Sequence, residues 1–232
     1  MHTLSSVIDI LFFHMELVGC IAFALSGVLT AIEKNLDLLG VLVLGSVTAV
    51  GGGVIRDLLL GITPPFMFRT PVYFYVAVCT SLLAFFIALL FRDTFFQETN
   101  RLSPIINIMD AVGLGIFTVF GVRTSILNGY ISNAFLSVFV GIITGVGGGI
   151  LRDMFVGKVP MIFHKHIYAL AAFAGASLYY ILARLDVSEL ISMPVGVLCI
   201  ITIRLFATHY RWNLPHIFPK QKNSGDESPH EN

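Results

Sequence analysis

The sequence contains Thr-Ala-Val-Gly-Gly-Gly-Val-Ile-Arg-Asp at residues 48–57. At residues 144–153, 96 positions later, it contains Thr-Gly-Val-Gly-Gly-Gly-Ile-Leu-Arg-Asp. The same offset aligns Gly61 with Gly157. Three successive glycines followed by an arginine and an aspartate form an unusual segment, so two copies of it indicate an internal duplication.

A second block upstream supports the duplication. An offset of 94 residues aligns Glu16 with Asp110, Gly19 with Gly113, Phe23 with Phe117, Gly27 with Gly121 and Val28 with Val122. The difference of two residues between the offsets falls in the loop after the first apolar stretch of each copy. Surface loops tolerate insertions of this kind.

The composition places the chain in a membrane. Hydrophobic residues make up 56% of it and charged residues 12%, whereas soluble domains have about 45–50% and about 25%. A helix needs about 20 apolar residues to cross the hydrocarbon layer. Seven stretches meet this length: 12–32, 38–60, 71–91, 105–123, 134–156, 166–184 and 190–208.

The duplicated unit contains three spans, so the second copy must enter the membrane upside down relative to the first. The sequence therefore predicts an all-α integral membrane protein with seven transmembrane helices, a 3+3 inverted repeat plus a seventh helix. The first repeat covers 12–91, the second 105–184, and the seventh helix 190–208. Together they form a single membrane domain, 1–208, and 213–232 is expected to be a polar, disordered cytoplasmic tail. Pathways of transporters often lie between such repeats.

Loop charges predict the orientation, because cytoplasmic loops are rich in Lys and Arg. The arginines within the repeated segments are left out of the count. The side of the N-terminus then has Arg69, Arg123 and Arg184. The other side has nine cations: Lys34, Arg92, Arg101, Lys158, Lys165, Arg204, Arg211, Lys220 and Lys222. We therefore expect an outside N-terminus and a cytoplasmic C-terminus in a plasma (inner) membrane.

The glycine triplets allow two interpretations. Each glycine costs a helix about 1 kcal/mol relative to alanine, and its use is either to open the helix beside a water-filled path or to let two helices pack closely. Packing needs one glycine per turn rather than three in a row, so we expect a bend. The residues concerned are Gly51, Gly52, Gly53, Gly147, Gly148 and Gly149.

Ionisable residues within spans are costly and are usually functional or paired. Four stand in the repeated segments: Arg56, Asp57, Arg152 and Asp153. Neighbours in sequence point about 100° apart on a helix, so an arginine is not expected to pair with the aspartate that follows it. Depth in the membrane suggests the pairs Glu16–Arg56 and Asp110–Arg152, one near each mouth of a central path. Each pair could instead only hold helices together.

Other side chains give weaker indications of function. Thr48 and Thr144 could offer hydroxyl groups to an ion or bond to their own helix. The aromatic run 73–75 is typical of the membrane interface. The sequence contains no nucleophile–base pair, phosphate-binding loop, metal-ligand spacing or basic patch. We therefore expect no enzyme, no cofactor and no nucleic-acid partner.

The doubled Gly-Gly-Gly-x-x-Arg-Asp-x-x-x-Gly-x-x-Pro in a seven-span chain resembles the prokaryotic trimeric intracellular cation (TRIC) channel family, whose bacterial branch is also described as a glycine transporter family. The resemblance covers about 12–208. It implies a homotrimer with a separate pore through each protomer. It also implies second and fifth helices kinked at the triplets, and passage of potassium and sodium.

Two classes of function follow. One is a passive channel for monovalent cations, in which freed carbonyl groups and the two threonine hydroxyls replace part of the hydration shell. The other is a carrier for a small solute such as glycine, whose carboxylate would bind Arg56 or Arg152. The sequence does not separate the two.

Overall fold

The computed structural model describes residues 2–91, 99–164 and 167–210. Its described elements are helical: α1 (His2–Glu33), α2 (Leu38–Leu59), α3 (Phe66–Arg69), α4 (Val72–Leu90), α6 (Thr99–Leu127), η1 (Tyr130–Ser132), α7 (Ala134–Phe155), α8 (Met161–His164), α9 (Ile167–Arg184) and α10 (Glu189–His209). The expected polar tail lies outside these residues.

Seven of the helices are long and apolar enough to span a membrane, and they correspond to the seven predicted stretches. Two helices begin earlier than expected: the first begins at His2 instead of residue 12, and the fourth begins at Thr99 instead of residue 105. Pro104 lies near the N-terminal end of this helix. As the sixth residue of the helix, it removes one intrahelical hydrogen bond, to the carbonyl of Asn100, but leaves the helix continuous.

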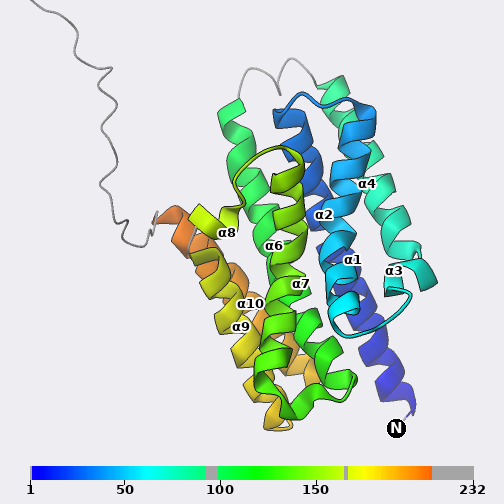
Figure 1. Ribbon diagram of the computed structural model, residues 1–232, viewed down its shortest axis with the longest axis vertical. Coiled ribbons are helices and arrows are strands. Elements are labelled where there is room, and N and C mark those ends of the chain that lie inside the picture. The colour runs from blue at the N-terminus through cyan, green and yellow to red at the C-terminus, as the bar shows by residue number, and fades with distance from the viewer. Residues whose placement is uncertain (1, 92–98, 165–166, 211–232) are drawn as a thin grey trace, which may run out of the picture.

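The two predicted repeats run in opposite directions (Figure 1). In that view α1 rises from the N-terminus and α6 descends from the opposite end. The helices α1, α2, α6 and α7 pack on one another at the centre, α4 packs on α1 and α2, and α9 packs on α6 and α7 in the matching way. The seventh helix, α10, packs on α9 and α6 and has no counterpart beside the first repeat.

The fourth glycine of each repeated segment ends its helix. Gly61 and Gly157 have φ values of 70° and 67°, the left-handed region that glycine adopts without strain. The next amide in each copy returns to the carbonyl of the motif aspartate, Ile62 to Asp57 at 2.8 Å and Lys158 to Asp153 at 2.9 Å. The chain then turns into the short helices α3 and α8, which were not expected from the sequence.

Candidate functional site

The glycine triplets form the crossing of α2 and α7. A Cβ on Gly52 would lie 2.1 Å from the carbonyl oxygen of Thr144, and a Cβ on Gly148 would lie 2.2 Å from that of Thr48. Neither helix is interrupted at its triplet, so the expected opening of the helices with freed carbonyl groups is not present. The middle glycine of each triplet instead allows backbone-to-backbone contact at the centre of the molecule.

The hydroxyl groups of the two threonines bond to their own helices. Thr48 donates its hydroxyl to the carbonyl of Leu44, and Thr144 donates to Val140, each at 2.6 Å. Both threonines are fully buried. Of the two roles considered, the structure has the hydroxyl bonded to its own helix.

The first Arg-Asp pair forms a direct contact, contrary to expectation. Arg56 Nε donates to Asp57 Oδ1 at 2.8 Å, and Asp57 Oδ2 accepts from the amide of Phe66 at 2.7 Å. The expectation was wrong because the long arginine side chain folds back around the helix end, where the aspartate also reaches α3. The aspartate therefore fixes both the guanidinium and the first amide of the short helix.

The second copy repeats this arrangement. Arg152 Nε donates to Asp153 Oδ1 at 2.9 Å, and Asp153 Oδ2 accepts from the amide of Met161, the first residue of α8, at 3.0 Å. Arg152 additionally donates to Ser26 of α1. Two segments far apart in the sequence thus form the same local structure at opposite ends of the α2–α7 crossing.

The expected carboxylate partners behave differently in the two repeats. Arg152 Nη1 lies 2.8 Å from Asp110 Oδ1, and both side chains are almost fully buried. Glu16 and Arg56 form no ion pair within the described structure, so this expected contact is absent. Glu16 instead accepts a hydrogen bond from the hydroxyl of Tyr73 at 2.5 Å. Tyr73, which the sequence placed in an interfacial aromatic belt, therefore also belongs to this cluster.

A cavity lies beside each Arg-Asp pair. The first has a volume of about 40 Å³, enough for a few water molecules. Its polar lining comes from Glu16, Cys20, Arg56, Asp57 and Tyr73, with Gly53 at its wall. Phe66 and Met67 of α3 also line it, and α3 lies in the half of the bundle that holds the N-terminal part of α1 (Figure 1).

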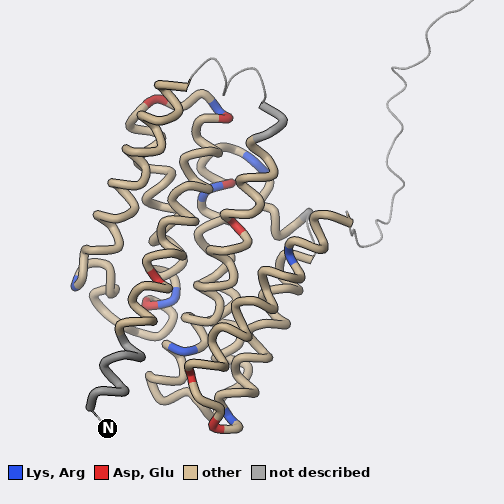
Figure 2. The backbone as a smooth tube through the Cα atoms, turned by 180° about the vertical axis from the view of Figure 1, so that it is seen from behind, with Lys and Arg blue, Asp and Glu red and all other residues tan. Residues whose placement is uncertain are grey.

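The second cavity has a volume of about 160 Å³. Its lining includes Arg152 and Asp153, together with Glu33 and Lys158, which form an ion pair of 3.0 Å. Charged residues accordingly lie inside the bundle as well as at its ends (Figure 2). Ionisable residues inside an apolar bundle usually face its interior or a cavity and mark functional sites.

Along α1, Phe23 lies between the levels of the two cavities. On α1 it follows Cys20 of the first cavity by three residues and precedes Ser26, the partner of Arg152, by three; residues so spaced share a helix face. Its ring is 1% exposed and stacks on Phe117, with centroids 5.3 Å apart. The aligned phenylalanines of the two repeats thus stack on each other between the levels of the two cavities.

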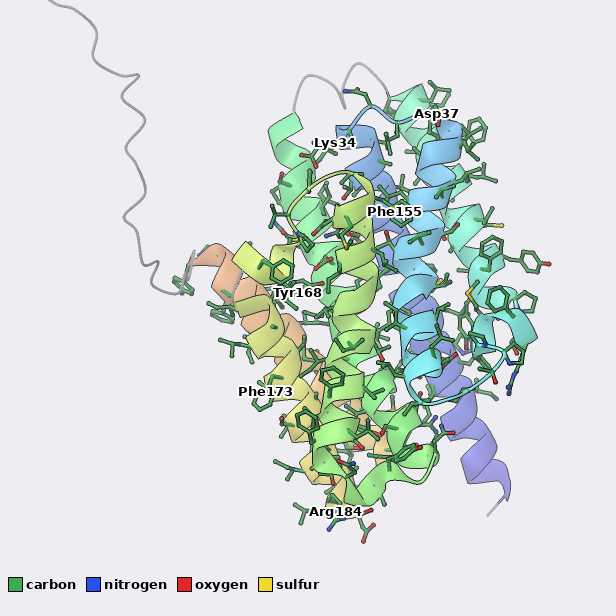
Figure 3. The ribbon with its side chains drawn as sticks, viewed as in Figure 1. Lys34, Asp37, Phe155, Tyr168, Phe173 and Arg184 are labelled. Carbon is green, nitrogen blue, oxygen red and sulfur yellow. The ribbon has the colours of Figure 1, made fainter. Side chains whose placement is uncertain are left out.

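Arg204 is buried in a helix, contrary to the expectation from the sequence that it lies in a loop. It was counted with the charged loops, but it is 2% exposed within α10. Its Nη2 lies 3.9 Å from Asp110 Oδ2, and its guanidinium carbon lies 4.6 Å from the ring centroid of Tyr168, near the start of α9 (Figure 3). An arginine inside the apolar run 190–208 was the available signal.

Comparison with known proteins places these features in a family. The family model described as Glycine transporter matches residues 13–88 and 107–184. The UPF0126 inner membrane protein YadS of Escherichia coli (strain K12) is 38% identical over 211 residues, which cover 88% of this chain and 95% of YadS.

Solved structures have the same fold. One, described as showing the structural basis for conductance through TRIC cation channels, is 36% identical with a TM-score of 0.77, over 91% of this chain and 99% of that one. The TRIC trimeric intracellular cation channel orthologue from Rhodobacter sphaeroides is 29% identical with a TM-score of 0.77, over 87% of this chain and 99% of that one. The chain is a multi-pass membrane protein, and it belongs to the glycine transporter family, which is the TRIC family.

Proposed function

We propose that this chain is a channel for monovalent cations, potassium and sodium, with a path through each protomer between α1, α2, α6 and α7. The observation that carries the proposal is the pair of charged cavities on opposite sides of the α2–α7 crossing, with Phe23 between their levels. The solved relatives described as TRIC cation channels support it. In this conformation the stacked rings of Phe23 and Phe117 block the path.

The repeated segments have two roles in this proposal. Gly52 and Gly148 hold the crossing together. The residues proposed to surround the path at either end of it are Thr48, Gly51, Gly53, Arg56, Asp57, Thr144, Gly147, Gly149, Arg152 and Asp153, with Glu16 and Asp110 beside them. Because each arginine contacts its neighbouring aspartate, neither is a free positive charge that would exclude cations.

The assembly and location are part of the same proposal. The Rhodobacter sphaeroides orthologue is described as trimeric, and YadS is named an inner membrane protein. We infer a homotrimer in the inner membrane, surrounded by lipid, with the N-terminus outside and the C-terminus in the cytoplasm.

A glycine carrier is the second candidate, because the family model is described as Glycine transporter. The first cavity presents Arg56, a guanidinium that could accept the carboxylate of an amino acid. Asp57, which pairs with Arg56, would then have to share this guanidinium with the carboxylate of the amino acid.

Planar-bilayer recording of the purified protein, with glycine uptake into proteoliposomes in parallel, separates the two functions. A channel gives unitary potassium and sodium currents that do not need glycine. Saturable uptake of glycine without unitary currents would overturn the channel and support the carrier. Absence of both activities from correctly assembled protein would refute both.

A further inference from the structure

The two cavities differ in charge, although each is lined by the Arg-Asp pair of one repeat. In the first, Glu16 and Asp57 are balanced only by Arg56. In formal charges this is two carboxylates against one guanidinium, an excess of one negative charge. Glu16 has no ion-pair partner in the described structure, and its hydrogen-bond donor, Tyr73, is neutral.

The second cavity is balanced. Its wall holds two carboxylates and two cations, namely Glu33, Asp153, Arg152 and Lys158. Asp110, the counterpart of Glu16, lies directly behind this wall in contact with Arg152. Asp110 adds one negative charge to this region, and Arg204, 3.9 Å away, balances that charge. Three carboxylates therefore face three cations.

The balancing charge comes from outside the duplicated unit. Arg204 belongs to α10, which packs on α9 and α6 of the second repeat, and the residues matched by the family model end at 184. Arg204 is 2% exposed, and its Nε and Nη2 have no hydrogen-bond partner within the described residues. A guanidinium without these hydrogen bonds is costly to bury. The attraction of the Asp110 carboxylate and of the Tyr168 ring for the guanidinium offsets this cost.

We propose that Arg204 neutralises the cavity of the second repeat, so that Glu16 at the opposite mouth is the one uncompensated carboxylate of the path and determines its preference for cations over anions. The proposal rests on the channel function proposed above. An excess charge in a cavity with apolar walls concentrates counter-ions and excludes ions of its own sign. The asymmetry also predicts that current passes more easily in one direction than in the other.

Reversal potentials in a gradient of potassium chloride across a planar bilayer test this. Glu16→Gln removes the excess charge, and we expect the potassium-to-chloride permeability ratio to fall by about tenfold. Arg204→Gln adds an excess charge at the other cavity, and the ratio should rise. In the double variant Glu16→Gln/Arg204→Gln, one uncompensated carboxylate remains, now Asp110, so the ratio should recover and the direction of rectification should reverse.

Two controls accompany these variants. Asp186→Asn removes an exposed carboxylate from the turn between α9 and α10, at a φ of 53° that asparagine also accepts, and should leave the ratio unchanged. Arg204→Lys keeps the positive charge beside Asp110 and should not raise the ratio as Arg204→Gln does. Glu16→Gln tests the proposal even if Arg204→Gln does not fold.

The outcomes separate this inference from the channel proposal. If the unaltered protein carries no current, the channel proposal fails. If it conducts, and either Glu16→Gln leaves the ratio unchanged or the double variant does not recover it, the charge asymmetry is refuted and the channel remains.

Discussion

Individual glycines of one triplet have different surroundings, although the sequence presents them as equivalent. A Cβ on Gly52 would overlap the backbone of α7, whereas a Cβ on Gly53 would have only the end of the Arg56 side chain nearby, at 3.9 Å. A one-dimensional pattern shows that three glycines are present but not which of them faces another backbone. The sequence therefore predicted the importance of the triplet but not its mechanism, which is contact rather than opening.

The first prediction compares these two glycines. Gly52→Ala should destabilise the protein by about 1–3 kcal/mol, because the added methyl group requires two helix backbones to separate. Gly53→Ala should be neutral or stabilise by up to about 1 kcal/mol, because alanine favours a helix and meets no obstacle here. Thermal unfolding of the purified variants in detergent measures both.

Gly148→Ala serves as the symmetric replicate of this comparison, since its added methyl group would meet the Thr48 carbonyl in the same way. It should behave like Gly52→Ala. Equal melting temperatures for Gly52→Ala and Gly53→Ala would contradict the packing role of the middle glycine.

Helices were the features best predicted from the sequence. Apolar stretches of about 20 residues are forced to be helical in lipid because every backbone group must be satisfied internally, and this requirement does not depend on side-chain detail. The helices α3 and α8, four residues each, carry no such signal. They depend on Asp57 and Asp153, whose carboxylates accept the first amide of each short helix.

The contact between α1 and α6 gives the second prediction. Phe23→Ala removes one of the two stacked rings that lie between the levels of the two cavities, so we expect a higher single-channel conductance or open probability in bilayer recordings. Loss of a buried phenylalanine also costs about 3–5 kcal/mol of stability, and the variant should be examined at low temperature.

Phe120→Ala is the matched control for Phe23→Ala. Phe120 is a buried ring of the same helix pair, in contact with Phe12 at a centroid distance of 6.2 Å, and lines neither cavity. It should lower stability comparably and leave conductance unchanged. If both variants change conductance alike, the effect is general loosening of the bundle and not the removal of a barrier.

At the scale of the whole molecule, the duplication predicted from the sequence explains most of the site. Aligned residues form equivalent contacts, from the paired phenylalanines to the two Arg-Asp segments. The duplication could not show which residues of the site come from outside the two repeats. Arg204 has no partner in the first repeat, and only the packing of α10 brings it to Asp110.

The last prediction concerns the two sides of the molecule and uses an introduced cysteine, because the native Cys20 is fully buried and donates its thiol to the carbonyl of Tyr73. Gly53 lines the first cavity, and a Cβ there would have only the end of the Arg56 side chain nearby, at 3.9 Å. With Gly53→Cys in a Cys20→Ser/Cys79→Ser/Cys199→Ser background, a membrane-impermeant thiol reagent should reduce the current when added to the side of the N-terminus and have no effect from the other side. The reason is that modification places bulk in a cavity of about 40 Å³, and the reagent cannot pass the stacked rings. The same background without Gly53→Cys must show no effect of the reagent. Inhibition from the C-terminal side alone would show that the first cavity opens opposite to the direction inferred here.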